Sequence, residues 1–410
     1  MSDRRTILVR LSGQDRPGIT AGVLGVLASA DVHVYDMEQV VVRGRLTLDI
    51  LVGVSARDDV LKELLFWGFT SDVHVEFEIV DDHEPSGPVS KFAVTVIGTP
   101  LTASALRAVT TAIADGGGNI DRIERLARYP VVAFEFDVAG GDMDVMRANL
   151  MVAAASHSID VAIQRQSLER RAKRLVVLDV DSTLIQDEVI ELLAAEAGCL
   201  DEVKAVTDRA MSGDVDFAVS LQERVARLAG TPADAMDRVR EKVRLTAGAR
   251  TFVRTLRRLG YEVALVSGGF LPIVESLAAD LGIRHVAANQ LEVVDGRFTG
   301  RLVGPLIDRA GKARVLRDVA AEQGIALEQT VAVGDGANDL DMLAAAGLGI
   351  AFNAKPAVRE AADTSLSVPY LDAILFLLGI RREDVEQADA DDPSVSDHTT
   401  PLPVPGTPPL

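Results

Sequence analysis

The chain has 410 residues, of which 48% are hydrophobic, and carries a formal net charge of -19 at pH 7. This length predicts roughly two to four domains, and the acidic charge argues against a surface for nucleic acid or an anionic membrane. Cys199 is the one cysteine, which excludes a disulfide within the chain and favours a reducing cytoplasm. The first ten residues lack the apolar region of a signal peptide, and no apolar run has the length of a membrane helix.

The first part of the chain predicts a small domain, which we place at residues 5–80. Helical patterns end near Ala28 and Trp67, and Arg43-Gly44 marks a hairpin turn between two strands. The resulting order βαββαβ is that of the split-βαβ, ferredoxin-like fold. The expected strands cover residues 6–12, 32–42, 46–54 and 73–80.

The same order recurs after a linker at 81–90 that contains acids, two prolines and a glycine. We place this second domain at residues 91–165, and read it as an internal duplication. Two such domains can pair their sheets within one chain or across a homodimer. The expected strands cover residues 92–97, 120–127, 131–138 and 159–163, and the expected helices cover 101–114 and 143–155.

A different architecture begins at residue 174. Continuous apolar runs at 174–180, 263–266 and 330–333 are typical of buried parallel strands, and helical patterns alternate with them. This pattern predicts an α/β domain at 174–386 with a Rossmann-like parallel sheet. A helical insert at about 195–242 is expected to form a cap over the strand ends. The acid- and proline-rich residues 387–410 are expected to be disordered.

Polar motifs follow the predicted strands, where ligands collect in an open parallel sheet. Asp179-Val180-Asp181-Ser182-Thr183 follows the first strand, and two carboxylates one residue apart need a cation to hold them together. One carboxylate can act as a nucleophile and the other as an acid or base. The same sheet edge carries Ser267-Gly268-Gly269, Lys312 and Gly334-Asp335-Gly336-Ala337-Asn338-Asp339. Ser267-Gly268 alone would also fit a plain turn, and Lys312 alone would fit a surface charge. It is therefore the combination of the motifs that indicates a functional site.

The four motifs together resemble the haloacid-dehalogenase superfamily of phosphatases, whose pattern is D-x-D-x-T, a Ser or Thr, a Lys and G-D-G-x-N-D. The resemblance covers about residues 174–380. The run DVDSTLIQDE at 179–188 is most similar to the phosphoserine phosphatases of that superfamily. This resemblance implies an enzyme that hydrolyses O-phospho-L-serine through an aspartyl-phosphate, the last step of serine biosynthesis.

The resemblance also implies a role for each motif. Asp179 would attack phosphorus, and Asp181 would protonate the serine oxygen and then activate water. Mg²⁺ would be held by Asp179, the backbone carbonyl of Asp181, and Asp335. The residues expected at the phosphoryl group or in contact with the metal shell are Ser267, Gly268, Lys312, Asn338 and Asp339.

Four further residues match the substrate site of that family. Glu188 would bind the ammonium group of the substrate and Arg224 its carboxylate, while Met211 and Phe217 would form an apolar wall. Without the resemblance, Arg224 also fits a solvated helix arginine paired with a glutamate, and Met211 and Phe217 fit the ordinary core of the cap.

The segment Gly13-Gln14-Asp15-Arg16-Pro17-Gly18 before a helix is similar to ACT domains, which commonly bind amino acids. Asp15, Gly18 and, in the second copy, Asn119 are the candidate regulatory residues, with serine as the expected effector. His33 stands where ACT domains often carry Asn, and the second copy lacks the Asp-x-Pro-Gly string. Each copy is therefore incomplete, and one hypothesis is a composite site formed by both copies or by two chains. The alternative is that these domains only dimerise the protein.

Three alternatives to a phosphoserine phosphatase remain open. The enzyme could act on another small phosphate ester, or pass the phosphoryl group to another alcohol. A non-catalytic amino-acid sensor is the third, which the intact motif set disfavours.

Overall fold

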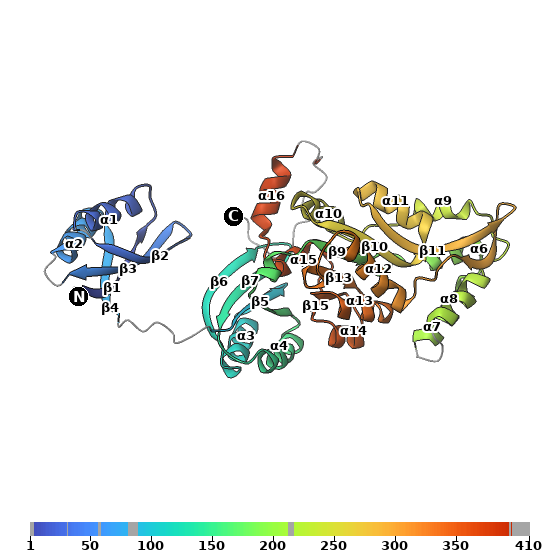
Figure 1. Ribbon diagram of the computed structural model, residues 1–410, viewed down its shortest axis with the longest axis horizontal. Helices are drawn as coiled ribbons and strands as arrows, with labels where there is room; N and C mark the ends of the chain where they lie inside the picture. The colour runs from blue at the N-terminus through green and yellow to red at the C-terminus, as the bar shows by residue number, and fades with distance from the viewer. Residues whose placement is uncertain are drawn as a thin grey trace. The chain divides into compact units, whose positions relative to one another are not determined.

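The computed structural model divides into two compact units, Met1–Pro88 and Val89–Leu410 (Figure 1). Within the described ranges, no helix is long and apolar enough to cross a membrane. The residues that the structure describes are 4–30, 32–55, 59–80, 89–211, 217–392 and 395.

The first unit is an antiparallel sheet of order β2-β3-β1-β4 with two helices. Alternate residues of its central strands, such as Val9 and Leu48, pack with Val23 and Leu64 from the helices. The predicted βαββαβ order is confirmed. β2 is an edge strand, and all ten of its residues are exposed. The elements are β1 (Arg4–Gln14), α1 (Ile19–Ala28), β2 (His33–Val42), β3 (Arg45–Ser55), α2 (Val60–Thr70) and β4 (Val73–Ile79).

The second unit begins with the same fold, with strand order β6-β7-β5-β8. Helices α3 and α4 cover one face of this sheet, where Val109 and Met146 pack against Val94 and Phe136 (Figure 1). The predicted duplication of the fold is therefore confirmed. The elements are β5 (Lys91–Gly98), α3 (Ala103–Asp115), β6 (Asn119–Ala127), β7 (Val132–Ala139), α4 (Met143–His157) and β8 (Asp160–Arg165).

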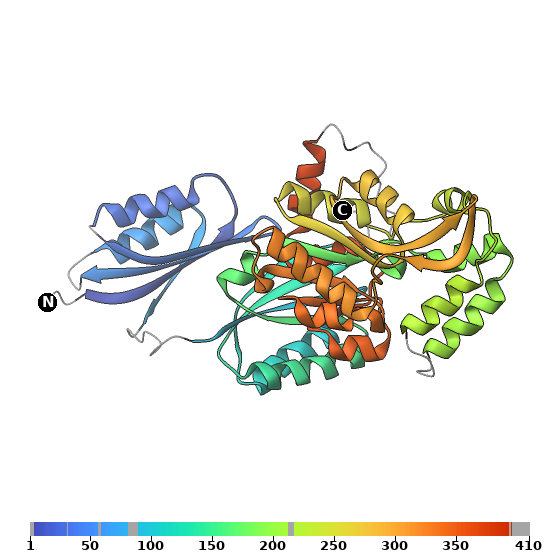
Figure 2. The ribbon, with the colours of Figure 1, turned by 45° about the vertical axis from the view of Figure 1, so that its right-hand side comes forward.

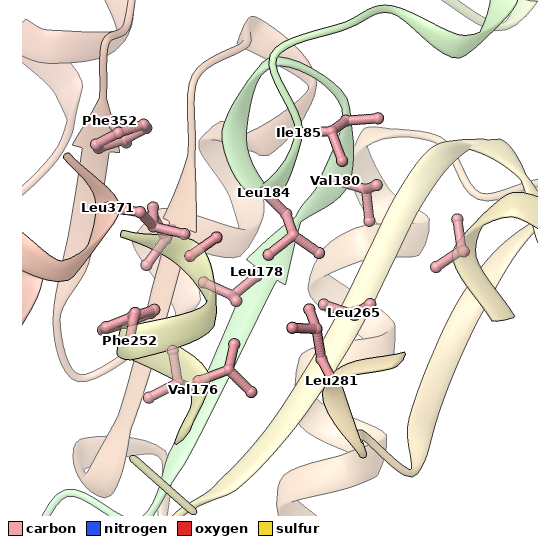
Figure 3. Close-up of a cluster of buried hydrophobic side chains, with 14 of the residues drawn as sticks. Val176, Leu178, Val180, Leu184, Ile185, Phe252, Leu265, Leu281, Phe352 and Leu371 are labelled. Carbon is pink, nitrogen blue, oxygen red and sulfur yellow. The ribbon is translucent and has the colours of Figure 1, made fainter. Parts of the chain in front are cut away.

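A seven-stranded sheet of order β12-β11-β10-β9-β13-β14-β15 forms the centre of the second unit. Its strands are parallel except at the β11–β12 hairpin, and the buried side chains of β9 and β10 pack against helix α10 (Ala249–Arg258; Figure 3). The predicted parallel α/β sheet is confirmed, and the hairpin is an addition. The strands are β9 (Leu175–Asp179), β10 (Glu262–Phe270), β11 (His285–Val294), β12 (Arg297–Val303), β13 (Thr330–Gly334), β14 (Gly349–Phe352) and β15 (Thr364–Leu366). The helices after these strands are α11 (Leu271–Leu281), α12 (Arg309–Glu322), α13 (Leu340–Ala345) and α14 (Pro356–Ala361).

The insert between β9 and β10 is helical, as expected, but its first helix begins at Val189, before the predicted start. Helix α8 lies beside the β11–β12 hairpin, and α7 packs against α8 (Figure 2). Gly300 of β12 permits this approach, because a Cβ there would lie 3.2 Å from the Ala226 backbone. The insert contains α6 (Val189–Ala197), α7 (Leu200–Met211), α8 (Phe217–Ala226) and α9 (Ala235–Arg240), and α10 (Ala249–Arg258) follows it.

The C-terminal segment extends further than predicted. The sequence places residues 387–390 in the disordered tail, but helix α16 (Arg382–Ala390) includes them. Asp389 is held at 2.5 Å by both Arg254 and Arg258, which explains why the helix continues. Residues 393–394 and 396–410 of the predicted tail lie outside the described residues. Before α16 come η4 (Leu371–Ala373) and α15 (Ile374–Leu377), and α5 (Leu168–Arg171) precedes β9.

Candidate active site

The carboxyl end of β9 places two carboxylates next to the sheet edge. All five residues of β9 are buried, and the strand ends at Asp179, which is 3% exposed. The turn η1 (Val180–Leu184) follows, in which Ser182 adopts a left-handed conformation with φ 57°. This turn reverses the chain sharply, so Asp179 and Asp181 both stay at the strand end.

Lys312 joins Asp179 to Asp339. Its Nζ lies 2.7 Å from an oxygen of each carboxylate, and its side chain is fully buried in the first turns of α12. Burial opposes the charge of Lys312, but Asp179 and Asp339 outweigh burial and raise its pKa. Burial and the charge of Asp339 raise the pKa of Asp179, which Lys312 opposes.

Asp181 has different partners from Asp179. Its Oδ2 accepts a hydrogen bond from Ser267 Oγ at 2.8 Å, and its Oδ1 accepts one from the Val189 backbone N–H at 2.8 Å. Burial raises the pKa of Asp181, and these two hydrogen bonds oppose that rise. The two carboxyl groups of the first motif are therefore held in distinct environments, as a nucleophile and an acid/base pair require.

A cation would fit beside Asp179, Asp335 and Asp339. One oxygen of each carboxylate lies within 4.8 Å of the others, and burial together with Asp339 raises the pKa of Asp335 to about 6. A hard cation relieves such repulsion and prefers oxygen ligands. Both oxygens of Asp339 are engaged, Oδ1 by Lys312 and Oδ2 by the Gly336 N–H at 2.9 Å, whereas Lys312 and the Val180 N–H both contact Oδ1 of Asp179, which favours Asp179 and Asp335 as the ligands.

A cavity of about 540 Å³ opens over these groups. Glu188 accepts a hydrogen bond from Ser182 Oγ at 2.7 Å, and burial with the nearby charge of Asp181 raises the pKa of Glu188 to about 7. Arg224 projects from α8 and is 9% exposed. The cavity thus has an acidic and a basic group beside the carboxylates of Asp179 and Asp181. Of the residues predicted from the sequence, it is lined by Asp179, Asp181, Glu188, Arg224, Gly268, Asp335 and Asn338.

Ser267, Lys312 and Asp339 contact the carboxylates of this site, and the other five predicted residues are described separately. Met211 ends α7 and Phe217 begins α8, on either side of residues 212–216, and the side chains of both fall outside the described part of the chain. Gly18 adopts φ 96° directly before α1, and Asp15 precedes it on the exposed turn after β1. Asn119 begins β6, and its Nδ2 donates to Asp121 at 2.9 Å.

Some residues that support the site have no local sequence signal. Asn289 of β11 is buried, and its Nδ2 donates to the Gly268 carbonyl at 2.9 Å while its Oδ1 accepts from the Ile307 N–H at 2.8 Å. It therefore connects the Gly268 turn to the segment before Lys312. Arg309 and Lys355 also line the cavity and add positive charge to its wall.

Three family models match separate parts of the chain. Residues 176–344 match the haloacid dehalogenase-like hydrolases, and residues 5–78 and 90–164 each match an ACT domain. These matches fall on the parallel-sheet domain and on the two ferredoxin-like domains respectively.

Close relatives cover nearly the whole chain. The phosphoserine phosphatase of Streptomyces coelicolor is 55% identical over 397 residues, which are 95% of this chain and 97% of the relative. Phosphoserine phosphatase SerB2 of Mycobacterium tuberculosis is 50% identical over 402 residues, 96% and 97% of the two chains. A crystal structure of a probable phosphoserine phosphatase from Vibrio cholerae aligns with a TM-score of 0.56 and 32% identity, over 72% of this chain and 88% of that one. The chain therefore belongs to the phosphoserine phosphatases of the haloacid dehalogenase-like hydrolases, in the form that carries two ACT domains.

Proposed function

We propose that the chain hydrolyses O-phospho-L-serine to serine and phosphate with Mg²⁺. One observation carries the proposal: Asp179, Asp181, Glu188 and Arg224 line a single cavity. The first pair supplies a nucleophile and an acid/base, and the second pair supplies opposite charges for the two ends of an amino acid. The close relatives that share the whole chain support the same substrate.

In the first half of the reaction, a carboxylate oxygen of Asp179 attacks phosphorus. The bond between phosphorus and the serine oxygen breaks, and Asp181 donates a proton to that oxygen as it leaves. Burial supports this role, because it raises the pKa of Asp181 and so favours the protonated form that can donate. Serine and an aspartyl-phosphate at Asp179 result.

In the second half, Asp181 accepts a proton from water and the water oxygen attacks phosphorus. The bond between phosphorus and Asp179 breaks, which frees the carboxylate and releases phosphate. Asp181 is thereby protonated again and ready for the next substrate.

Other residues bind the phosphoryl oxygens. Ser267 Oγ, the Gly268 N–H and Lys312 would donate to these oxygens as charge spreads over them. Mg²⁺ held by Asp179, the Asp181 carbonyl and Asp335 would neutralise charge on the phosphoryl group and on the carboxylates. Asp339 keeps Lys312 in place, and Asn338 lines the cavity near the transferred group.

Specificity comes from the cap and from the segment before it. Glu188 binds the substrate ammonium group, and Arg224 its carboxylate. Met211 and Phe217 would form the apolar wall of the same site. Because α7 and α8 carry these groups on the insert, we expect the insert to close over the bound substrate and exclude water.

The ACT domains are the proposed regulatory and assembly part of the chain. Serine would bind near the turn of Asp15 and Gly18 in the first domain and near Asn119 in the second, and would slow catalysis. The fully exposed edge strand β2 supports a homodimer through the ACT domains, because an unpaired edge can pair with a second copy. The single cysteine supports a cytoplasmic location.

The deciding experiment is phosphate release from L-phosphoserine with Mg²⁺, with and without EDTA, for the wild type and Asp179→Asn. Release that EDTA and Asp179→Asn both abolish supports the metal and the nucleophile together. Release from another small ester but not from phosphoserine would keep the mechanism and reject the roles of Glu188 and Arg224. Transfer to an added alcohol in excess of hydrolysis would identify a phosphotransferase.

A further inference from the structure

The second ACT domain shares its core with the phosphatase domain. The sheet face that α3 and α4 leave uncovered packs on the segment η4–α15, where Ile97 and Ala133 join the same buried cluster as Phe376. Polar contacts cross the same boundary: Gln164 Nε2 donates to the Leu377 carbonyl at 2.8 Å. A change in this domain can therefore be passed on by direct packing.

Arg382, at the start of α16, contacts both sides of this boundary. Its guanidinium lies 5.2 Å from the ring centre of Tyr129, which belongs to the turn between β6 and β7. Its Nη1 donates to Asp372 at 2.7 Å, and its Nε donates to Glu386 at 3.0 Å. The Tyr129 hydroxyl donates to the same Glu386 oxygen at 2.7 Å, so ring, guanidinium and carboxylates form one network.

Asp372 connects this network to the turn that ends the cap insert. It is 6% exposed and is packed against Gly248, where a Cβ would overlap its carboxylate. Gly248 adopts φ 81°, and the neighbouring Leu371 N–H donates to the Ala247 carbonyl at 2.8 Å. The position of residues 246–248 therefore depends on Asp372, whose buried charge depends on Arg382.

Thr246 connects that turn to the catalytic motif. Its Oγ1 donates to the Thr183 carbonyl at 2.7 Å, and its N–H donates to the Leu184 carbonyl at 2.9 Å. Thr183 Oγ1 in turn donates to Asp335 Oδ1 at 3.1 Å. Leu184 and Leu371 lie in one cluster of buried side chains, so apolar packing accompanies these bonds (Figure 3).

We propose that Thr246 is a positioning residue for Asp335, and that the Arg382–Asp372 pair links it to the second ACT domain through Tyr129. Thr246 fixes Thr183, and Thr183 fixes the oxygen of Asp335 that it contacts. A group that orients a metal ligand changes metal affinity by about 10- to 100-fold when it is removed. The inference rests on the proposed phosphatase function, but Mg²⁺ binding tests it without turnover.

The first test compares Thr246→Val with Thr246→Ser. Valine keeps the shape and loses the hydroxyl, whereas serine keeps the hydroxyl. Calorimetric titration of the full chain with Mg²⁺ should give a dissociation constant raised about 10-fold for Thr246→Val, and close to the wild-type value for Thr246→Ser. Wild-type Mg²⁺ affinity in Thr246→Val would overturn the proposal.

The second test separates the link from general stability. Arg382→Met should weaken Mg²⁺ binding, while Arg381→Met should not, because Arg381 pairs at the surface with Asp384 and with Glu124 of β6 rather than with Asp372. Tyr129→Phe, which keeps the ring, should fold normally and show a smaller change in the same direction. If Arg382→Met and Tyr129→Phe both lower the melting temperature but bind Mg²⁺ as the wild type does, the link to the ACT domain is refuted.

A third outcome concerns the proposed function itself. Suppose that Thr246→Val binds Mg²⁺ more weakly than the wild type, as expected, but that the wild type releases no phosphate from phosphoserine. The positioning network then stands, and the substrate assignment fails. The two failures are thus distinguishable.

Discussion

Ser267 donates a hydrogen bond to Asp181 at 2.8 Å, so the hydroxyl expected to hold a phosphoryl oxygen also holds the acid/base carboxyl in place. The same Oγ accepts from the Gly269 N–H at 2.7 Å, which fixes the hydroxyl itself. In the proposed reaction, one side chain would therefore orient both the phosphoryl group and the proton donor.

Ser267→Ala should lower kcat by about 10²- to 10³-fold, the usual loss for one donor to a developing negative charge. The melting temperature should change little. Steady-state phosphate release checks this, with Ser276→Ala on α11 as the matched control. An unchanged kcat would show that Ser267 contacts neither the phosphoryl group nor the proton donor during turnover.

Lys312→Met should abolish activity and destabilise the second unit by about 3–5 kcal/mol, because it leaves Asp179 and Asp339 buried without their cation. Urea unfolding without Mg²⁺ measures the effect. Lys204→Met removes an exposed pair with Glu191 and should cost about 0–1 kcal/mol. Equal effects in the two variants would contradict the buried network.

Arg224→Met should lower kcat/KM for phosphoserine roughly 10- to 100-fold, the size expected for a hydrogen bond to a charged group. The loss should be much smaller for phosphoethanolamine, which has no carboxylate. Arg227→Met, one turn further along at the surface, is the control. An equal loss on both substrates would mean that Arg224 acts on the cap structure rather than on the carboxylate.

Substrate binding should weaken at low pH because of Glu188. Burial and Asp181 raise its pKa to about 7, and protonation removes the negative charge that attracts the ammonium group. KM for phosphoserine should therefore rise as the pH falls through about 7. Glu188→Gln should have a raised KM that no longer follows this change, and a phosphate ester without an amino group should show no such dependence. A pH-dependent KM that persists in Glu188→Gln would assign the titration to another group.

The sequence predicts the central strands and the site motifs well because both are local. The apolar run before Asp179 specifies a buried strand, and a parallel sheet brings the strand ends together. The β11–β12 hairpin also has a local signal, the dipeptide Asp295-Gly296, and the φ angles of 50° and 72° at these residues fit the hairpin turn.

Long-range contacts could not be predicted in the same way. Thr246 and Thr183 are 63 residues apart, and Arg382 contacts Tyr129 from the far end of the chain. Nothing in either local sequence specifies the partner, because hydroxyls and guanidinium groups occur on most surfaces. The helix at 387–390 was missed for the same reason, since its stabilising partners Arg254 and Arg258 lie in α10.

The buried cluster that includes residues of β5, β7 and α15 also determines how the chain should melt. Apolar side chains that belong to one cluster lose their partners together, so the second ACT domain and the phosphatase domain should unfold cooperatively. The first unit has a separate core and is free to unfold in its own transition. A calorimetric trace should therefore resolve two heat-absorption peaks for a chain with three folded domains, and ligands of the phosphatase site should shift the peak that includes the second ACT domain.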